Sequence, residues 1–221
     1  MAGKTSGKTS GKTGGKTGGS PGAGRVIAGR AAGRRLVGSG PGTRALTDRV
    51  KQTLFAILEP DLPGSRFLDL CAGTGAGGIE ALSRGATSAT FVERDPDAVR
   101  IIADNLDRTG LAGPSVRVVR ADAGAWLRSP TAAADGPFDI VLLDPPYDDA
   151  TLLAELLGTL GGDSSAEPEA GRILAPAALV VAKHFRRTSP PAGIGLLRSI
   201  RERRFGETTL TFYRRVALED E

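Results

Sequence analysis

Hydrophobic residues follow two alternating patterns along most of the chain. Short apolar runs predict buried strands, and apolar residues three or four positions apart predict amphipathic helices. Strands are expected at Arg66–Leu70, Ala89–Glu93, Ser115–Arg120, Phe138–Leu143 and Leu179–Lys183. Helices are expected at about Gly75–Arg84, from Asp95 to Gly110 and near Asp149–Leu160. Strands that alternate with helices predict a parallel, doubly wound α/β sheet that binds ligands at the carboxyl ends of its strands.

The segments on either side of this repeat have other patterns. Ahead of it, Thr47 is placed to cap a helix whose apolar face ends before Pro60. After it, Leu196–Arg203 and Thr208–Arg214 flank a turn and predict an antiparallel hairpin that makes the sheet mixed. A long polar loop at Gly161–Gly171 separates the last helix from the fifth strand.

The first 46 residues are organised differently. Residues 1–24 consist mostly of a Gly-Lys-Thr repeat that has no apolar residues to bury, and they are predicted to be a disordered tail. The spacing of the repeat does not fit a phosphate-binding P-loop, and no strand precedes it. Residues 25–46 contain Arg25–Gly29 and Gly33–Val37, two short segments that predict a basic hairpin and its connection. Residues 47–221 are expected to form the main domain.

Length and composition are those of one domain with a core. The chain has 221 residues, of which 40% are hydrophobic. One cysteine, Cys71, excludes an internal disulfide and fits a reducing compartment. The longest apolar runs have the length of strands, and the N-terminus has no apolar signal-peptide core. We therefore expect a soluble, cytoplasmic, monomeric protein with no membrane partner.

Charge is distributed unevenly along the chain. Nine of the 29 Lys and Arg residues, and none of the 25 acidic residues, precede Asp48. The rest of the chain is therefore mildly acidic, although the formal net charge of the whole is +4. A basic arm on an acidic body favours a polyanionic partner, nucleic acid above all. For the tail alone, a solubilising role is the alternative.

A glycine-rich loop follows the first predicted strand. Gly73, Gly75 and Gly78 have the G-x-G-x-x-G spacing, and Glu93 lies 20 residues after Gly73 at a strand end. Such glycines let the backbone approach a ligand, and an acid at this distance binds ribose hydroxyls. Taken alone, the pattern fits a dinucleotide site.

Two further carboxylates change this interpretation. Asp69 would repel a diphosphate, but it is placed to hold the amino group of S-adenosylmethionine. Asp122 follows the third strand, where it is placed to accept from the adenine amine. Each acid has an alternative role as a helix cap. Four successive strand ends that carry Asp69, Glu93, Asp122 and Asp144 nevertheless favour a class I methyltransferase.

The sequence Asp144-Pro-Pro-Tyr147 is suited to methylating an exocyclic base amine. The lone pair of that nitrogen is delocalised into the base, so the amine is a weak nucleophile. A carboxylate from Asp144 and the carbonyl of Pro145 can accept its two N–H bonds, and the Tyr147 ring can stack on the base. The prolines hold φ near −65° and offer no competing N–H. A simple turn at the end of a strand is the alternative.

Several motifs, spread over roughly Arg25 to Arg215, together resemble one known family. They are Arg25–Gly29 with Gly33–Leu36, Thr47–Lys51 with Leu54-Phe55, Asp69–Gly75, Gly78–Ala86, Phe91–Arg94, Asp144–Tyr147 and Arg204–Thr208. This pattern resembles the bacterial 16S ribosomal RNA guanine-N2 methyltransferases, the RsmD family. Gly77 departs from it, because the family usually has leucine there, and glycine is expected to loosen the start of that helix.

The resemblance implies a fold, a reaction and a set of site residues. The fold would be an α/β, Rossmann-like class I methyltransferase sheet, mostly parallel with a C-terminal antiparallel hairpin. The reaction would be transfer of a methyl group from S-adenosylmethionine to N2 of the guanine conventionally numbered 966, in the small ribosomal subunit or its assembly intermediate. The implied catalytic residues are Asp144, Pro145, Pro146 and Tyr147, and the implied cofactor-binding residues are Asp69, Ala72, Gly73, Gly75, Glu93, Arg94, Asp122 and Ala123. We assign RNA contacts to Arg25, Arg30, Arg34, Arg35, Arg44 and Arg49, and we expect no metal.

Three other functions remain open at this point. A DNA adenine-N6 methyltransferase can use the same Asp-Pro-Pro-Tyr chemistry, although the chain has no obvious extra domain for target recognition. A nicotinamide-dependent oxidoreductase would use the glycine loop but would leave Asp69 and Asp144–Tyr147 unexplained. A ribosome-assembly RNA-binding protein without enzyme activity is the third.

Three single residues have weaker functional interpretations. Cys71 is the only thiol, but its place in the glycine loop favours packing over nucleophilic catalysis. His184 is interpreted as structural or solvent-facing rather than as part of the pocket. Trp126 is expected to pack near the adenine rather than to stack on a base.

Overall fold

The structure, a computed structural model, describes residues 24–38, 46–147, 149–162 and 173–216. The predicted tail, apart from Gly24, and Arg44 therefore lie outside the described residues. Within these ranges, no helix combines the length and the apolar character needed to cross a membrane.

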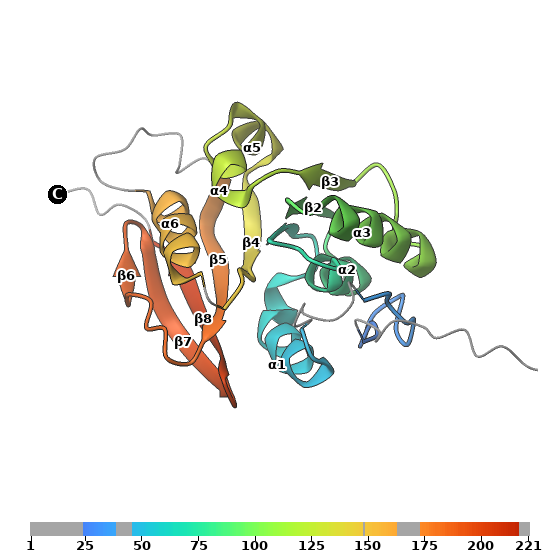
Figure 1. Cartoon of the computed structure of the whole chain (residues 1–221), viewed down its shortest axis with the longest axis horizontal. Helices are drawn as coiled ribbons and strands as arrows, with labels where there is room; N and C mark the ends of the chain where they lie inside the picture. Colours follow the sequence, from blue (N-terminus) through green and yellow to red (C-terminus); the bar gives the residue numbers. More distant parts are fainter. Residues whose placement is uncertain (1–23, 39–45, 148, 163–172, 217–221) are drawn as a thin grey trace, which may run out of the picture.

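The described chain forms a mixed, eight-stranded sheet in the order β3-β2-β1-β4-β5-β8-β7-β6 (Figure 1). The first five of these strands run parallel, and β8, β7 and β6 continue the sheet in antiparallel fashion. The strands are β1 Arg66–Leu70, β2 Ser88–Glu93, β3 Val116–Arg120, β4 Phe138–Leu143, β5 Leu174–Phe185, β6 Gly193–Ile194, β7 Leu197–Phe205 and β8 Thr208–Arg215. The predicted α/β class, with a mostly parallel sheet and a C-terminal antiparallel hairpin, is confirmed.

Helices fill the crossovers between parallel strands, and one further helix with its 3-10 turn precedes β1. They are α1 Asp48–Leu58, α2 Ala76–Ser83, α3 Pro96–Thr109, α4 Ala123–Leu127, α5 Pro130–Asp135 and α6 Ala150–Gly161, with a 3-10 turn, η1, at Glu59–Asp61. Thr47 and Asp95 cap α1 and α3 as predicted, each accepting a backbone N–H in the first turn. The short helices α4 and α5 were not predicted, because five or six residues are too few to produce a helical period.

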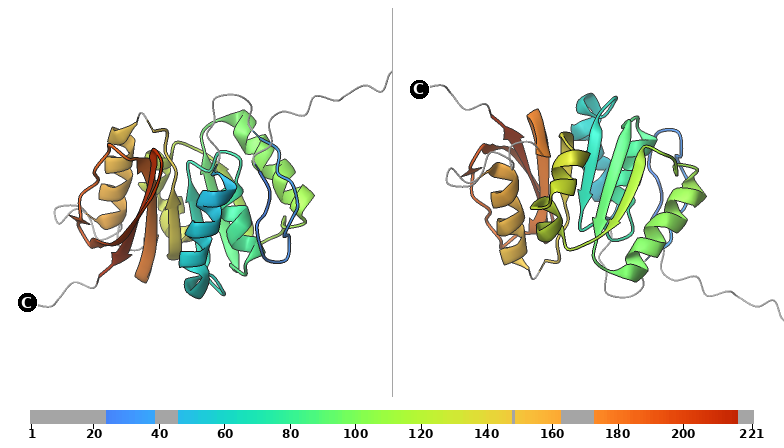
Figure 2. Two further views of the ribbon diagram at one scale, coloured as in Figure 1. Left: turned by 90° about the horizontal axis from the view of Figure 1, so that it is seen from below. Right: turned by 90° about the horizontal axis from the view of Figure 1, so that it is seen from above.

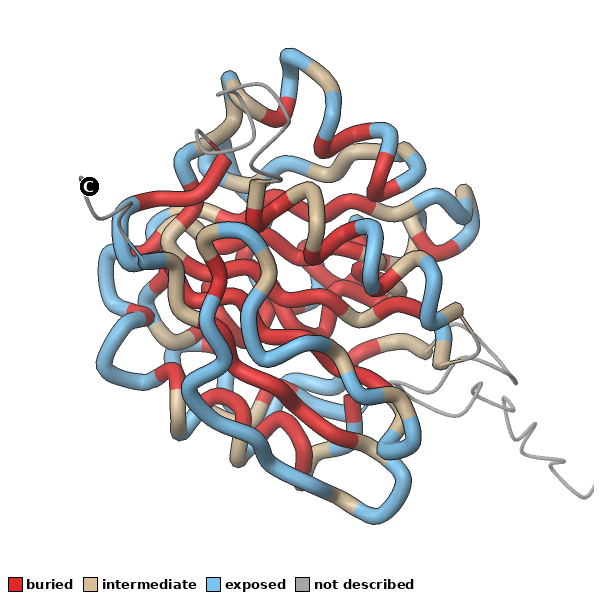
Figure 3. Tube along the Cα trace, turned by 90° about the vertical axis from the view of Figure 1, so that its left-hand side faces the viewer, coloured by how far each residue is buried: buried red, intermediate tan, exposed pale blue. Residues whose placement is uncertain are grey.

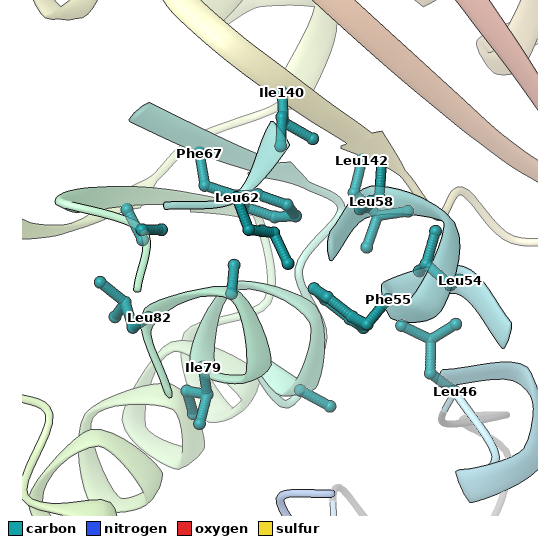
Figure 4. Packing of buried hydrophobic residues seen from close by; sticks show 14 of the residues in the cluster. Leu46, Leu54, Phe55, Leu58, Leu62, Phe67, Ile79, Leu82, Ile140 and Leu142 are labelled. Carbon is teal, nitrogen blue, oxygen red and sulfur yellow. The ribbon is translucent and has the colours of Figure 1, made fainter. Parts of the chain in front are cut away.

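Helices cover both faces of the sheet. The two faces alternate along β1, because Phe67 packs with α1, α2 and α3 whereas Leu68 packs with α4 and α6. Figure 2 shows the sheet between these layers, and Figure 4 shows Leu54, Phe55 and Leu58 of α1 directed at the strands. The apolar face predicted before Pro60 is thus a core face.

The N-terminal segment forms a tight loop rather than the two short strands that were predicted. Between its two arms the only bridge among the described residues pairs Arg25 with Arg35. Other backbone groups bond to the body of the protein, since Ile27 and Ala28 donate to Glu80 and Val37 donates to Asn105. Three backbone hydrogen bonds also join the two arms, from Val26 N–H to Arg34 O, from Gly33 N–H to Val26 O and from Leu36 N–H to Gly24 O. The long-range acceptors therefore supplement a short ladder. Figure 2 shows the loop lying beside α3.

β7 is exposed along almost its whole length. Only Leu197 is buried, and the following residues from Arg198 to Arg204 are all exposed. Figure 3 looks at the molecule from the side of β6 and β7, where pale blue segments lie in front of the buried strands. This strand carries four of the exposed arginines, at positions 198, 201, 203 and 204.

Candidate functional site

A cavity of about 850 Å³ lies at the carboxyl ends of β1, β2, β3 and β4. It collects almost all the residues that the sequence predicts for catalysis and cofactor binding. These are Asp69, Ala72, Gly73, Glu93, Arg94, Asp122, Ala123, Asp144, Pro145, Pro146 and Tyr147. Gly75 does not line it; instead its φ of 75° turns the chain into α2. Gly75 therefore determines the path of the glycine loop without lining the cavity.

Glu93 holds the glycine loop in place. One of its oxygens accepts from the Gly73 N–H at 2.8 Å and the other accepts from the Asp95 N–H at 2.9 Å. Gly73 has a φ of 55°, and a Cβ added to it would meet no atom within 4 Å. The loop backbone thus borders open space on the cavity side, where a ligand can approach it.

Asp69 is a buried carboxylate beneath the loop. It accepts from the Gly78 N–H at 2.8 Å, inside α2 rather than as its cap. Burial raises the pKa of Asp69 to about 8, and the nearby Asp144 and Glu93 carboxylates add to the rise. A cation that binds beside Asp69 would favour the ionised carboxylate and so offset the free-energy cost of burying its charge.

Gly77 has a packing role beside Asp69. A Cβ at this position would lie 2.5 Å from Leu142 Cδ2 and 3.0 Å from Asp69 Oδ2. The glycine therefore lets α2 approach β1 and β4 closely, and the helix begins at Ala76 despite it.

Asp122 caps α4 at the next strand end. Its Oδ1 accepts from the Ala125 N–H at 3.0 Å, so the predicted alternative role of Asp122 as a helix cap is confirmed. The side chain is exposed and also lines the cavity, so the two roles coexist.

The three single residues with weaker interpretations occupy different environments. Trp126 packs against Phe138 and His184 bonds to Thr211, both outside the cavity lining. Cys71 lines the cavity, but burial, with Glu93 and Asp144 nearby, raises its pKa to about 12. A thiol of that pKa is not a nucleophile near neutral pH.

Asp144–Tyr147 continues directly from β4. The Asp144 N–H donates to Leu70 O at 3.2 Å, which extends the β1–β4 ladder by one residue. Pro146 O accepts from the Asp149 N–H at 3.0 Å and closes a turn before α6. The Tyr147 hydroxyl lies 2.6 Å from Thr208 Oγ1 at the start of β8. The segment is a strand-ending turn that also faces the cavity.

Lys183 is a cavity residue that the sequence did not single out. Its Nζ contacts Asp144 Oδ1 and lies 4.7 Å from the centre of the Tyr147 ring. The side chains of Lys183 and Asp144 are only 6% and 17% exposed. Burial raises the pKa of Asp144, although Lys183 opposes the rise. The available signal was that Lys183 is the last residue of the strand predicted at Leu179–Lys183.

Sequence comparisons place the chain close to proteins named for one activity. The profile of the family described as conserved hypothetical protein 95 matches residues 24–214. YlbH of Bacillus subtilis, named as a candidate rRNA methyltransferase, is 36% identical over 86% of this chain and 98% of its own length. Ribosomal RNA small subunit methyltransferase D of Escherichia coli is 41% identical over 56% of this chain, a match that spans 60% of that enzyme.

Solved structures that resemble this chain are also described as methyltransferases. The Escherichia coli protein YhhF, described as a candidate methyltransferase, superposes with a TM-score of 0.73 and 32% identity, over 88% of this chain and 99% of that one. An RNA methyltransferase from Salinibacter ruber, solved with S-adenosyl-L-homocysteine, has 18% identity and a TM-score of 0.56, over 79% of this chain and 96% of that one. At that identity the likeness concerns the fold alone, which is the class I methyltransferase fold.

Proposed function

This chain belongs to the family of conserved hypothetical protein 95, with YlbH and the RsmD enzymes, and we propose that it methylates the exocyclic N2 amine of a guanine in 16S ribosomal RNA. The observation that carries the proposal is the convergence of Asp69, Glu93 and Asp144 on one cavity with Tyr147 beside them. The guanine conventionally numbered 966, in the small subunit or its assembly intermediate, is the target that the resemblance to the RsmD family implies.

The residues present fit S-adenosylmethionine, the cofactor of this enzyme. Three carboxylates at successive strand ends suit an ammonium group, a ribose diol and an adenine amine, and they would repel a diphosphate. Asp69 would hold the ammonium, Glu93 the ribose and Asp122 the adenine amine, with Ala72, Gly73, Arg94 and Ala123 lining the site. When bound, the cofactor supplies an electrophilic methyl group on a sulfonium.

Asp144 would prepare the guanine amine for attack. Its carboxylate and the Pro145 carbonyl accept the two N2–H bonds, while the Tyr147 ring packs on the base. Methylation would leave N2 with a surplus proton, and the Asp144 carboxylate would accept it. Thr208 holds the Tyr147 hydroxyl and so fixes the position of that end of the ring.

Exposed arginines would bind the RNA backbone. Arg30, Arg35 and Arg49 are exposed, and no ion pair joins them to another described residue. Arg25 pairs with Asp48 at 3.4 Å and Arg34 donates to Arg108 O, so both have structural roles as well. The arginines of β7 lie toward the other end of the sheet from the N-terminal loop, where they would form a second basic surface (Figure 1).

The proposal is tested with methyl-labelled S-adenosylmethionine and small subunits that lack base methylation, with naked DNA in parallel. We expect label in the RNA as N2-methylguanine, and a fall in kcat of about 100- to 1,000-fold in Asp144→Asn, which loses one acceptor oxygen. Asp139→Asn is the matched control, because Asp139 lies at the opposite end of β4 and accepts from the Arg66 N–H. Label in DNA alone would refute the RNA substrate and favour the adenine methyltransferase.

A further inference from the structure

Lys183 is the cation in direct contact with the proposed catalytic carboxylate. β4 and β5 are parallel neighbours whose register pairs Leu143 with Ala182, so the next residues, Asp144 and Lys183, lie side by side. The resulting ion pair is almost completely buried. A buried lysine is costly in a protein interior unless it is paired. Packing alone therefore gives no reason for a lysine at the end of β5.

We propose that Lys183 is a positioning residue for methyl transfer, one that keeps Asp144 ionised and directs its free oxygen toward the substrate amine. The inference rests on the proposed function. Lys183 Nζ engages Oδ1 of Asp144, which leaves Oδ2 as the oxygen able to accept an N–H from the base.

Ionisation of Asp144 decides whether it can accept that hydrogen bond. A neutral carboxylic acid carries a proton on one oxygen and loses part of its accepting capacity. The groups that share its cavity are mostly acidic. They are Asp69 on β1, Cys71 after β1, Glu93, Arg94 and Asp95 at and after the end of β2, Asp122 after β3, Tyr147 after β4, Lys183 on β5 and Glu207 before β8.

The balance of these charges depends on Lys183. Burial raises the pKa of Asp144, and Lys183 is the group that lowers it. Burial is the largest influence on Lys183 and lowers its pKa, but Asp144 and Tyr147 together raise the pKa by more, so it is raised overall. The two groups therefore hold each other in the charged state, and removal of the ammonium leaves Asp144 to be protonated at a higher pH.

Lys183 also limits where a base can stack. Its ammonium lies over the Tyr147 ring, and the Phe185 ring is tilted by 45° to Tyr147 at 6.2 Å. A cation over an aromatic face is attracted to it. The ammonium thus covers one face of the Tyr147 ring and closes that face to a stacked guanine.

The first test is the pH dependence of kcat/KM for wild type, Lys183→Met and Lys183→Arg. In Lys183→Met we expect the acid limb to move to higher pH by about one unit or more, so that activity relative to wild type falls about tenfold or more near pH 6.5 and recovers near pH 9. Lys183→Arg keeps the charge and should restore the acid limb. A loss by the same factor at every pH would overturn the proposal, because a purely structural role predicts that result.

A second test needs neither RNA nor turnover. In protein labelled with ¹³C at aspartate carboxyls, the Asp144 resonance is identified by its loss in Asp144→Asn. We expect its titration midpoint to rise in Lys183→Met and to stay near the wild-type value in Lys183→Arg. An unchanged midpoint in Lys183→Met would refute the role of Lys183 even if the RNA substrate proved to be different. Conversely, a raised midpoint together with an inactive wild type would refute the proposed function alone.

Discussion

Glu80 anchors the N-terminal loop, and its removal should strongly destabilise the protein. Its side chain is fully buried in α2 and accepts from Ile27 N–H at 2.8 Å and Ala28 N–H at 3.0 Å. It also accepts from Arg84 Nε at 2.8 Å and lies 3.8 Å from Lys51 Nζ, which is equally buried. Burial lowers the pKa of Lys51, and Glu80 is the main group that opposes this.

Glu80→Ala leaves the Lys51 cation without its carboxylate and two backbone N–H groups without their acceptor. Breaking a buried pair in this way costs about 3–5 kcal/mol. For a chain of this length, that loss lowers the melting temperature by roughly 6–20 °C. Glu80→Gln keeps an acceptor oxygen but loses the charge, so we expect a smaller cost of about 2–3 kcal/mol.

Urea unfolding followed by circular dichroism measures these free energies directly. Glu155→Ala is the matched control, because Glu155 forms an exposed pair with Arg128 and its loss should cost less than about 1 kcal/mol. Adding Lys51→Met to Glu80→Gln should recover at least about 1 kcal/mol relative to the sum of the single changes. A Glu80→Ala variant within about 1 kcal/mol of wild type would refute the reasoning.

Two further measurements test the ligand-facing residues. Because the pKa of Asp69 is raised to about 8 and its ionised form would bind the cofactor ammonium, affinity for S-adenosyl-L-homocysteine should weaken about tenfold for each pH unit below 8. Titration calorimetry should find this dependence abolished in Asp69→Asn, and a flat wild-type response would contradict it. Replacing Arg30, Arg35 and Arg49 with alanine should reduce the slope of log affinity against log salt by about 2–3 if each contacts a phosphate. An unchanged slope would remove these arginines from the RNA surface.

Local signals in the sequence predicted much of the fold. The bounds of β4 match the expectation, because Phe138–Leu143 is a continuous apolar run between polar residues. β5 begins five residues earlier than predicted, since Pro176 interrupts the apolar pattern and Ala177 has a φ of 59° within the strand. Such an irregularity depends on pairing with β4, whose register shifts there.

Contacts between distant residues could not be predicted in the same way. The acids at strand ends were found because parallel strands end at one edge, a general property of the fold. Lys183 was named only as the last residue of a predicted strand, because its contact with Asp144 depends on β5 lying next to β4. The hydrogen bonds of Glu80 join segments about fifty residues apart, and no sequence pattern in either segment predicts its contact with the other.

The strand order also determines when the parts of the cavity can assemble during synthesis. β8 lies between β5 and β7, so β7 leaves the ribosome before the strand with which it must pair. Thr208, the residue that bonds to the Tyr147 hydroxyl, is the first residue of β8. The parallel strands around Asp69 and Glu93 precede β8 in the chain, and Leu210 and Phe212 of β8 complete the core that packs against them. The strand ends proposed to hold the cofactor therefore emerge before the residue that bonds to the Tyr147 hydroxyl.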